Sequence, residues 1–376
     1  MQTASFEIDP DIRRASTPPG WLYTDATVFD RQRDAIFARS WQLIGDSDLA
    51  RVPGQVHPFV FLDGCVGEPL LLSRNLDDQL HCVSNVCTHR GMLVCEHAGV
   101  ERTLRCRYHG RRFGLDGRFQ QMPEFAGVEG FPSEADHLAP ATLDAWGKFL
   151  FVALAAASHA TDSNRNRRLV EFADWIEPMR RRMEWLPLHE FQFDAGRSRE
   201  FLVRANWALY VENYLEGFHI PYVHSSLNDT LDYGEYRTEL FDWCSLQVGV
   251  AGSGEPAFDL PPRAADSGQR IAAYYWWLFP NLMFNFYPWG LSINVVRPLA
   301  VDRIRVSFLS YVWDAGKLDI GAGAALDRVE REDEAIVETI QRAIGARLYS
   351  RGRYSPTRET GTHHFHRLLS RVMAAG

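Results

Sequence analysis

Between residues 40 and 156, apolar and polar positions alternate in short runs, which is typical of β-strands that bury one face. Gly, Asp and Asn separate the runs, which read HPFVFLD, EPLLLSRN, QLHCVSN, RTLRCRY and WGKFLFVAL. The pattern predicts a small antiparallel β domain over 40–156. The polar stretch AASHATDSNRNR follows and is typical of a linker. We therefore expect a second domain over 157–376.

Residues 206–224, NWALYVENYLEGFHIPYVH, show the spacing of an amphipathic helix. One face of this helix would be aromatic, with Trp207, Tyr210, Val211, Tyr214 and Phe218. The opposite face would carry Glu212, Asn213, Glu216 and His219. Pro221 is expected to end the helix, and the turn that follows can bring His224 back towards His219.

Two further segments have helical spacing. Residues 325–348 carry an apolar stripe with Asp333 in its middle. The stripe comprises Leu326, Val329, Ile336, Val337, Ile340 and Ile344. Near the N-terminus, residues 24–41 predict an amphipathic helix, so we expect 1–39 to pack on the second domain.

The composition is that of a globular chain, since 46% of its 376 residues are apolar and 23% are charged. The net charge of -8 includes no Lys/Arg run, so a nucleic-acid partner is not expected. No apolar run approaches the roughly 20 residues of a membrane span, and the N-terminus resembles no secretory signal. We expect a cytoplasmic protein that does not enter a membrane. The six cysteines predict buried or metal-bound thiols rather than a disulfide scaffold.

Two short loops, NVCTHRG and CRYHG, share one design in which a cysteine precedes a histidine and a glycine follows. They contain Cys87 with His89 and Cys106 with His109. Two thiolates and two imidazoles suit a tetrahedral zinc, or a [2Fe–2S] cluster in which two histidines replace two cysteines on one iron. Each loop offers one ligand of each kind, unlike a zinc finger that groups its cysteines. This arrangement favours the cluster, with zinc as the alternative.

A second constellation lies in 206–224, which contains two acids and two histidines but no Lys or Arg. A bound cation would balance this negative charge. An iron site with two histidines and one carboxylate needs a third ligand and leaves positions open for dioxygen. Asp333 is the candidate, because a carboxylate within a buried stripe is costly unless it is paired or binds a metal. The alternative for Asp333 is a buried salt bridge.

Residues 272–290, AAYYWWLFPNLMFNFYPWG, concentrate nine aromatic side chains. Alternation along a strand would send about half of them inward. They are either plain core or a cage for an aromatic or quaternary ammonium substrate. The histidines of THHFH, residues 362–366, are expected to serve packing or the surface rather than a metal.

The loop pattern resembles that of the Rieske family, C-x-H, about 16 residues, then C-x-x-H, at all four ligand positions. Cys95 has no counterpart in the second loop, so the loops look more like those of Rieske oxygenases and ferredoxins than of respiratory Rieske proteins. Arg111 stands where many oxygenases have Trp. Glu216, His219, His224 and Asp333 are similar to the iron-site motif of Rieske non-haem iron oxygenases. The spacing looks most like that of the choline, glycine betaine and carnitine monooxygenases.

The resemblance implies an α+β fold in which a small antiparallel Rieske domain precedes a helix-grip catalytic domain. It also implies a homotrimer, in which Glu216 bridges iron ligand His219 and the cluster ligand His109 of the partner subunit. Asn213 would stand near the metal. The cofactors implied are a [2Fe–2S] Rieske cluster and a mononuclear Fe(II), with O2 as co-substrate. The chain has no G-x-G-x-x-G after a strand, so NAD(P)H electrons would come through a separate flavin or iron–sulfur reductase.

The function implied is that of a terminal oxygenase, or alpha subunit, which hydroxylates a small quaternary ammonium compound. Hydroxylation would lead to N-dealkylation or to an aldehyde. Two alternatives remain at this point: an aromatic ring-hydroxylating dioxygenase alpha subunit, and a Rieske electron-transfer protein that needs only the cluster.

Overall fold

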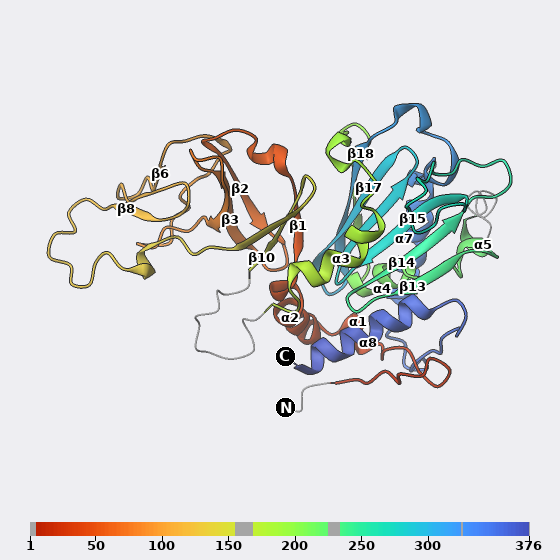
Figure 1. Cartoon of the computed structure of the whole chain (residues 1–376). Helices are drawn as coiled ribbons and strands as arrows, with labels where there is room; N and C mark the ends of the chain where they lie inside the picture. The colour runs from red at the N-terminus through yellow and green to blue at the C-terminus, as the bar shows by residue number, and fades with distance from the viewer. Residues whose placement is uncertain (1–4, 155–167, 225–233, 325, 376) are drawn as a thin grey trace. The chain divides into compact units, whose positions relative to one another are not determined.

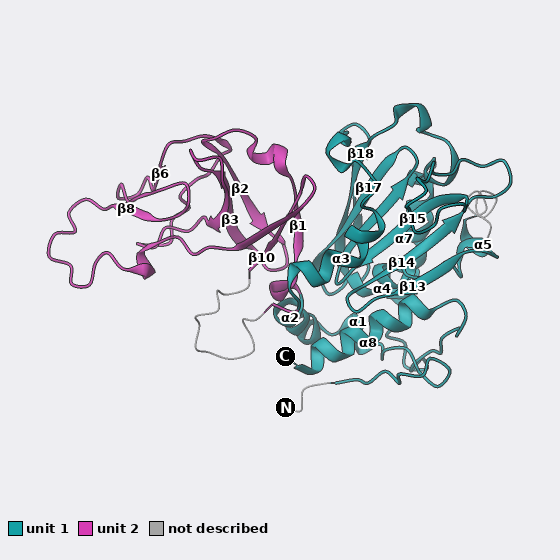
Figure 2. Cartoon of the chain, in the orientation of Figure 1, with its two compact units in different colours: residues 1–36, 170–376 teal, residues 37–169 magenta. Residues whose placement is uncertain are grey.

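The chain forms two compact units in a computed structural model that describes residues 5–154, 168–224, 234–324 and 326–375 (Figure 2). Unit 2 is Phe37–Leu169, whereas unit 1 combines Met1–Ile36 with Val170–Gly376. Both contain antiparallel sheets, and unit 1 adds the long helices, which confirms the expected α+β class. The stretch expected to be a linker lies outside the described residues.

Unit 2 is built from three small sheets of antiparallel strands (Figure 1). The first sheet has the order β1 (Gln42–Asp46), β10 (Phe149–Ala153), β9 (Thr142–Trp146). The second is β4 (Leu80–Ser84), β3 (Glu68–Arg74), β2 (Gln55–Phe61), β5 (Gly99–Val100). The third is β6 (Leu104–Arg105), β7 (Arg112–Phe113), β8 (Phe119–Gln121). Each of the five alternating runs contains a strand, but RTLRCRY contributes only two residues because the chain turns at Cys106.

The core of unit 2 reaches into both cysteine loops. Cys87 and Cys106 belong to one buried cluster together with apolar side chains from the second and third sheets, among them Leu71, Val83 and Phe113. The two loops are therefore fixed to a packed interior rather than to a mobile surface.

Unit 1 is organised around one antiparallel sheet with the order β11-β18-β17-β16-β15-β14-β13, in which β12 also pairs with β18. Its strands are β11 (Gln192–Phe193), β12 (Arg199–Val203), β13 (Arg237–Leu240), β14 (Cys244–Val250), β15 (Ile271–Leu278), β16 (Leu282–Tyr287), β17 (Gly290–Ala300) and β18 (Arg303–Val312). The register places Gln247 opposite Tyr275, Tyr275 opposite Asn285, and Asn285 opposite Ser292. These polar side chains thus form one row across the sheet.

Seven α-helices are described: α1 (Trp21–Thr24), α2 (Ala26–Ala35), α3 (Phe172–Arg182), α4 (Trp207–Tyr214), α5 (Ile220–Val223), α7 (Leu326–Ala343) and α8 (Thr360–Ala375). Helix α4 packs against α7 and against β17, and α8 contacts β13 and α2. The side chain of Asp25 accepts hydrogen bonds from the first turn of α2, which starts that helix. Among the described residues, no helix combines the length and hydropathy that crossing a membrane requires.

The helix predicted over 206–224 is interrupted, which corrects the role given to Pro221. Helix α4 ends at Tyr214, and Pro221 lies in the first turn of the short helix α5 instead of ending a helix. The carboxylate of Glu216 accepts the backbone N–H groups of Phe218 and His219, which satisfies donors that a continuous helix would use internally. Phe218 is 40% exposed and so does not belong to a buried aromatic face.

The stripe predicted on 325–348 is only partly buried. Val337 is fully buried in helix α7, but Ile336 and Ile340 are each 37% exposed.

The histidines of THHFH lie within α8, where His363 and His366 are buried. This confirms their expected role in packing.

Candidate metal sites

The two cysteine loops of unit 2 have the same backbone hydrogen bonds. In each loop the cysteine N–H donates to the carbonyl five residues later, at 2.8 Å for Cys87 and 2.9 Å for Cys106. The N–H groups of Gly91 and Gly110 donate back to the two cysteine carbonyls, at 3.0 Å in both loops. Both glycines have positive φ, 72° and 76°, a conformation that residues with a Cβ rarely adopt.

The four side chains converge as a cluster site requires. Neither cysteine is in a disulfide, and the Cys87 thiol lies within hydrogen-bonding reach of Cys106. The rings of His89 and His109 are 4.7 Å apart between centroids. Nδ1 of His109 is buried and has no hydrogen-bond partner, as expected for an atom that binds a metal. Burial raises the pKa of Cys87, so a thiolate there needs a cation beside it. The donor set fits a [2Fe–2S] cluster.

Arg111 has a structural role next to this site. Its side chain is 2% exposed, donates to Asp136 at 2.6 Å, and lies over the rings of Phe119 and Phe131. An arginine at this position is therefore part of the packing of unit 2 and not of the surface around His109.

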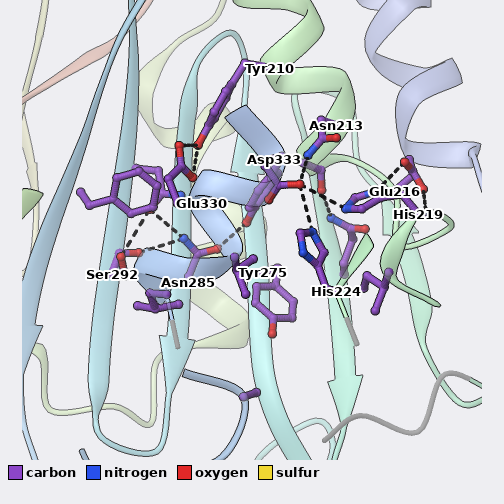
Figure 3. A pocket seen from close by; sticks show the side chains of 18 of the residues that line it. Tyr210, Asn213, Glu216, His219, His224, Tyr275, Asn285, Ser292, Glu330 and Asp333 are labelled. Atoms are coloured by element: carbon purple, nitrogen blue, oxygen red, sulfur yellow. Dashed lines mark hydrogen bonds and ion pairs between the residues drawn. The ribbon is translucent and has the colours of Figure 1, made fainter. Parts of the chain in front are cut away.

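Unit 1 contains a cavity of about 120 Å³ between α4, α7 and the sheet (Figure 3). Three elements bring the predicted metal ligands, together with Asn213 and Glu216, to it: α4 with the segment before α5, the end of α5, and α7. The candidates that line the cavity are Asn213, Glu216, His219, His224 and Asp333. Its polar floor includes Gln247, Tyr275, Asn285 and Ser292, the row that the sheet register creates.

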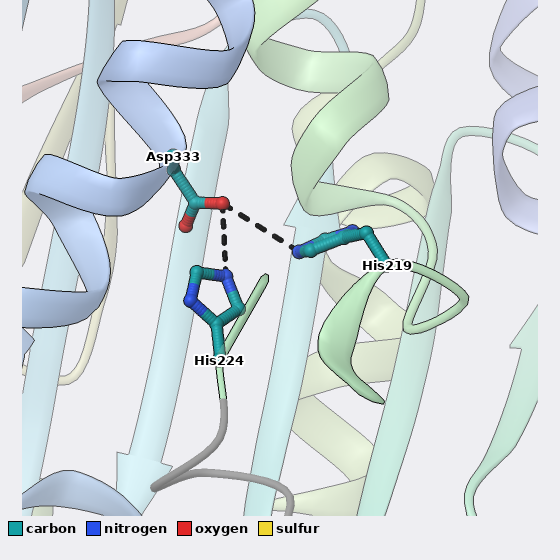
Figure 4. A group of neighbouring side chains, drawn as sticks. All are labelled: His219, His224 and Asp333. Carbon is teal, nitrogen blue, oxygen red and sulfur yellow. Dashed lines mark hydrogen bonds and ion pairs between the residues drawn. The ribbon is translucent and has the colours of Figure 1, made fainter. Parts of the chain in front are cut away.

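His219, His224 and Asp333 form a compact triad (Figure 4). One ligand atom from each lies within 4.8 Å of the others, and no other group of three metal-binding residues does so in the described part of the chain. Both histidines present Nε2 to Oδ1 of Asp333, at 3.5 Å for His219 and 3.0 Å for His224. Two imidazoles and one carboxylate are the donor set of non-haem iron sites with open positions, so these residues fit such an iron.

The far nitrogen of each imidazole is held by a carboxylate. Nδ1 of His219 lies 2.7 Å from Oε1 of Glu216, and Nδ1 of His224 lies 2.7 Å from Oε2 of Glu332. Asn213 Nδ2 donates to Oδ1 of Asp333 at 2.7 Å. A carboxylate on Nδ1 fixes the tautomer that leaves Nε2 free for a metal. Burial opposes the charged form of His224, but Asp333 and Glu332 outweigh it and raise the pKa of that imidazole.

Two acids at the site were not expected from the sequence. Glu332 directly precedes Asp333, so a helix turns it about 100° away from the metal face, but its longer side chain reaches back to His224. Glu330 lines the cavity and is hydrogen-bonded to the hydroxyl of Tyr210. A signal was present for Glu330, because it precedes Asp333 by one helical turn. Conversely, Glu212 does not line the cavity, since its carboxylate lies 2.9 Å from Nε2 of His366.

The aromatic run 272–290 divides between core and cavity. Tyr275 and Tyr287 line the cavity, whereas Trp276, Trp277 and Phe284 are fully buried elsewhere. The core interpretation holds for the buried side chains, and the cage stays a prediction for Tyr275 and Tyr287.

Family models match both units of the chain. The model described as "Ring hydroxylating alpha subunit (catalytic domain)" matches residues 182–375, and the model described as "Rieske [2Fe-2S] domain" matches residues 41–132. The chloroplastic choline monooxygenase of Arabidopsis thaliana is 31% identical, over 96% of this chain and 85% of that protein. The carnitine monooxygenase oxygenase subunit of Escherichia coli K12 is 27% identical, over 96% of this chain and 94% of that protein.

A solved structure shares the fold over nearly the full length. A quaternary ammonium Rieske monooxygenase superposes with a TM-score of 0.75 over 98% of this chain and 100% of that one, at 23% sequence identity.

Proposed function

The chain belongs to the Rieske non-haem iron oxygenases, and from this premise we propose that it hydroxylates a small quaternary ammonium compound. Membership of the family confirms the expected Rieske [2Fe–2S] cluster, the mononuclear non-haem iron, and the use of O2 with electrons from a reductase. It also makes the alternative of a simple electron carrier wrong, because the catalytic domain is present.

We assign the cluster to Cys87, His89, Cys106 and His109, and the iron to His219, His224 and Asp333. When bound there, the iron supplies the open coordination positions at which dioxygen is activated. Glu216 and Glu332 keep Nδ1 of the two imidazoles protonated, so that Nε2 carries the lone pair. Asn213 donates to Asp333 and so fixes the direction of its carboxylate.

The lining of the cavity carries the substrate proposal. Six aromatic side chains surround it: Tyr210, Tyr214, Tyr236, Tyr275, Tyr287 and Phe308. Three carboxylates join them, those of Glu216, Glu330 and Asp333, and no Lys or Arg is among the described lining residues. Aromatic faces and carboxylates both attract a permanent organic cation. The relatives named above are monooxygenases of choline and of carnitine, which are both trimethylammonium compounds.

The proposed reaction inserts one atom of O2 into a C–H bond and reduces the other atom to water. Two electrons and two protons complete the balance, and the electrons come from NAD(P)H through a separate flavin or iron–sulfur reductase. Hydroxylation of a carbon that bears nitrogen or a hydroxyl gives an unstable product, which releases an aldehyde. The small cavity limits the substrate to a compact molecule.

We further propose that the protein works as a homotrimer and that Glu216 connects subunits. Its carboxylate already holds Nδ1 of the iron-ligand candidate His219. In this proposal a second copy brings the partner subunit's His109 to the same carboxylate.

The reaction is tested by supplying the purified protein with O2, NADH and a compatible reductase. We expect NADH consumption and aldehyde release with a trimethylammonium compound. Formation of cis-diols from aromatic substrates, with no turnover of any quaternary ammonium compound, would instead support the ring-hydroxylating alternative.

A further inference from the structure

Glu330 is a buried acid in the cavity that the iron site does not use. Its side chain is 5% exposed, and its two carboxyl oxygens lie 2.8 and 2.7 Å from the hydroxyl of Tyr210. When Glu330 is ionised, the single proton of this hydroxyl can satisfy only one of these oxygens. The carboxyl group is therefore present in the cavity without the set of donors that a buried acid ordinarily has.

Among the described residues, no positive side chain compensates this acid. Within the part of the chain that the structure describes, no Lys, Arg or His contacts Glu330, and the undescribed residues 225–233 contain none of these residue types. Burial raises the pKa of Glu330 well above its usual range. An uncompensated buried carboxylate is strongly unfavourable, and a cation bound in the cavity would remove that cost.

The position of Glu330 is suited to a substrate rather than to the metal. It precedes Asp333 by three residues on α7, so the two side chains leave the same helix face one turn apart. In Figure 3 Glu330 lies with Tyr210 and Ser292, whereas Glu216 and His219 lie on the other side of Asp333. A cation held at Glu330 would thus have its neighbouring carbons directed towards the triad.

The remainder of the floor is polar but neutral. The Tyr214 hydroxyl donates to Asn285 at 2.7 Å, Asn285 donates to Asn294 at 3.1 Å, and the Ser292 hydroxyl lies 3.3 Å from Asn294. Such groups can donate a hydrogen bond to a hydroxyl of the substrate and accept one from it. A carboxylate on the substrate would find no positive partner among them and would be repelled by Glu330.

We propose that Glu330 is the recognition residue for the cationic head of the substrate, and that the neutral floor selects an amino alcohol over a zwitterion that carries a carboxylate. This proposal rests on the proposed function and names its substrate class. It distinguishes choline-like compounds from betaine-like compounds, which share the same trimethylammonium head.

The test is a set of binding constants measured by anaerobic calorimetry on the protein with cluster and iron in place. The ligands are choline, its neutral carbon isostere 3,3-dimethylbutan-1-ol, and glycine betaine. Wild type should bind choline about tenfold or more tightly than either other compound. Glu330→Gln should lose most of that preference for choline over the isostere and retain its affinity for the isostere. Asp327→Asn removes an exposed acid of the same helix and should change nothing.

Equal binding of choline by wild type and Glu330→Gln would overturn the assignment, and so would tight binding of glycine betaine. If Glu330→Gln does not load iron, the wild-type series can still overturn the proposal, because equal affinities for choline and its isostere contradict recognition by charge. If no quaternary ammonium compound is bound or oxidised, the proposed function itself is wrong. Oxidation of choline with no effect of Glu330→Gln contradicts only the role of Glu330.

Discussion

Each histidine of the iron triad is oriented by a carboxylate on its far nitrogen, and this support should matter for metal affinity. Glu332→Gln keeps the size of the side chain but weakens the charge-assisted bond to Nδ1 of His224. We expect about 10-fold weaker retention of iron, the lower end of what losing such a partner costs. Iron per chain after dialysis against graded chelator measures this.

The matched control for that variant is Glu334→Gln, since Glu334 is an acid of the same helix whose carboxylate does not contact the triad. Its iron content should equal that of wild type. Equal iron retention in Glu332→Gln and in the control would show that His224 does not depend on Glu332.

Among single residues, the sequence indicated those metal-ligand candidates whose residue type or spacing was unusual. Spacing alone marked Cys87, Cys106 and their histidines, and the isolated charge in an apolar stripe marked Asp333. Glu332 could not be found in this way, because its role depends on the rotamer of a long side chain that bends back over one turn. For Glu330 only its position one turn before Asp333 was a signal, because its burial is created by α4, a segment more than 100 residues away.

At the scale of elements, the positive φ of the loop glycines is needed in unit 2. A Cβ built on Gly91 would have no other atom within 4 Å. Gly91→Ala would therefore be destabilised only by the φ of 72° at this position. That conformation costs a residue with a Cβ about 1 kcal/mol. Heating should therefore bleach the visible absorbance of the cluster a few degrees (about 4 °C) lower than in wild type.

Gly99→Ala is the control for this strain, because Gly99 also has open space around its Cβ but lies outside the positive-φ range. We expect no shift of the bleaching temperature there. If the bleaching temperature falls equally in both variants, the positive φ of Gly91 is not the reason for its effect.

Element prediction succeeded where one period ran without interruption. The alternation of apolar and polar residues predicted the strands of unit 2, and apolar residues at helical spacing predicted α7. The helix expected over 206–224 was wrong after Tyr214, because the Glu216 side chain competes with the helix for backbone N–H groups. Gly217 adds to this break, since a Cβ there would meet the Tyr236 ring at 2.9 Å.

For the whole molecule, the proposed passage of electrons between subunits can be tested by complementation. Cys106→Ser removes a cluster ligand and Asp333→Ala removes an iron ligand, so each homo-oligomer should be inactive. Co-expressed chains should recover part of the wild-type turnover, because a cluster in one subunit would serve an iron in its neighbour. Mixing the two proteins after separate purification, without subunit exchange, is the control and should give no activity.

Failure of the co-expressed chains to recover activity, with mixed oligomers shown to be present, would place the electron route within one chain. The assembly of subunits depends on surfaces between copies. The hydrophobic periodicity of one chain carries no signal for such surfaces. The sequence alone predicted two domains, and it proposed residues for both metal sites that stay predictions, whereas the trimer came only from a resemblance.

The most direct test of the account is Asp333→Ala, compared with Asp327→Ala on the exposed side of the same helix. We measure visible absorbance, iron per chain, and oxidation of a trimethylammonium compound coupled to NADH. Asp333→Ala should keep the cluster spectrum of wild type, lose the mononuclear iron and lose turnover, while Asp327→Ala keeps all three. Wild-type turnover in Asp333→Ala would contradict the assignment of the iron to this triad.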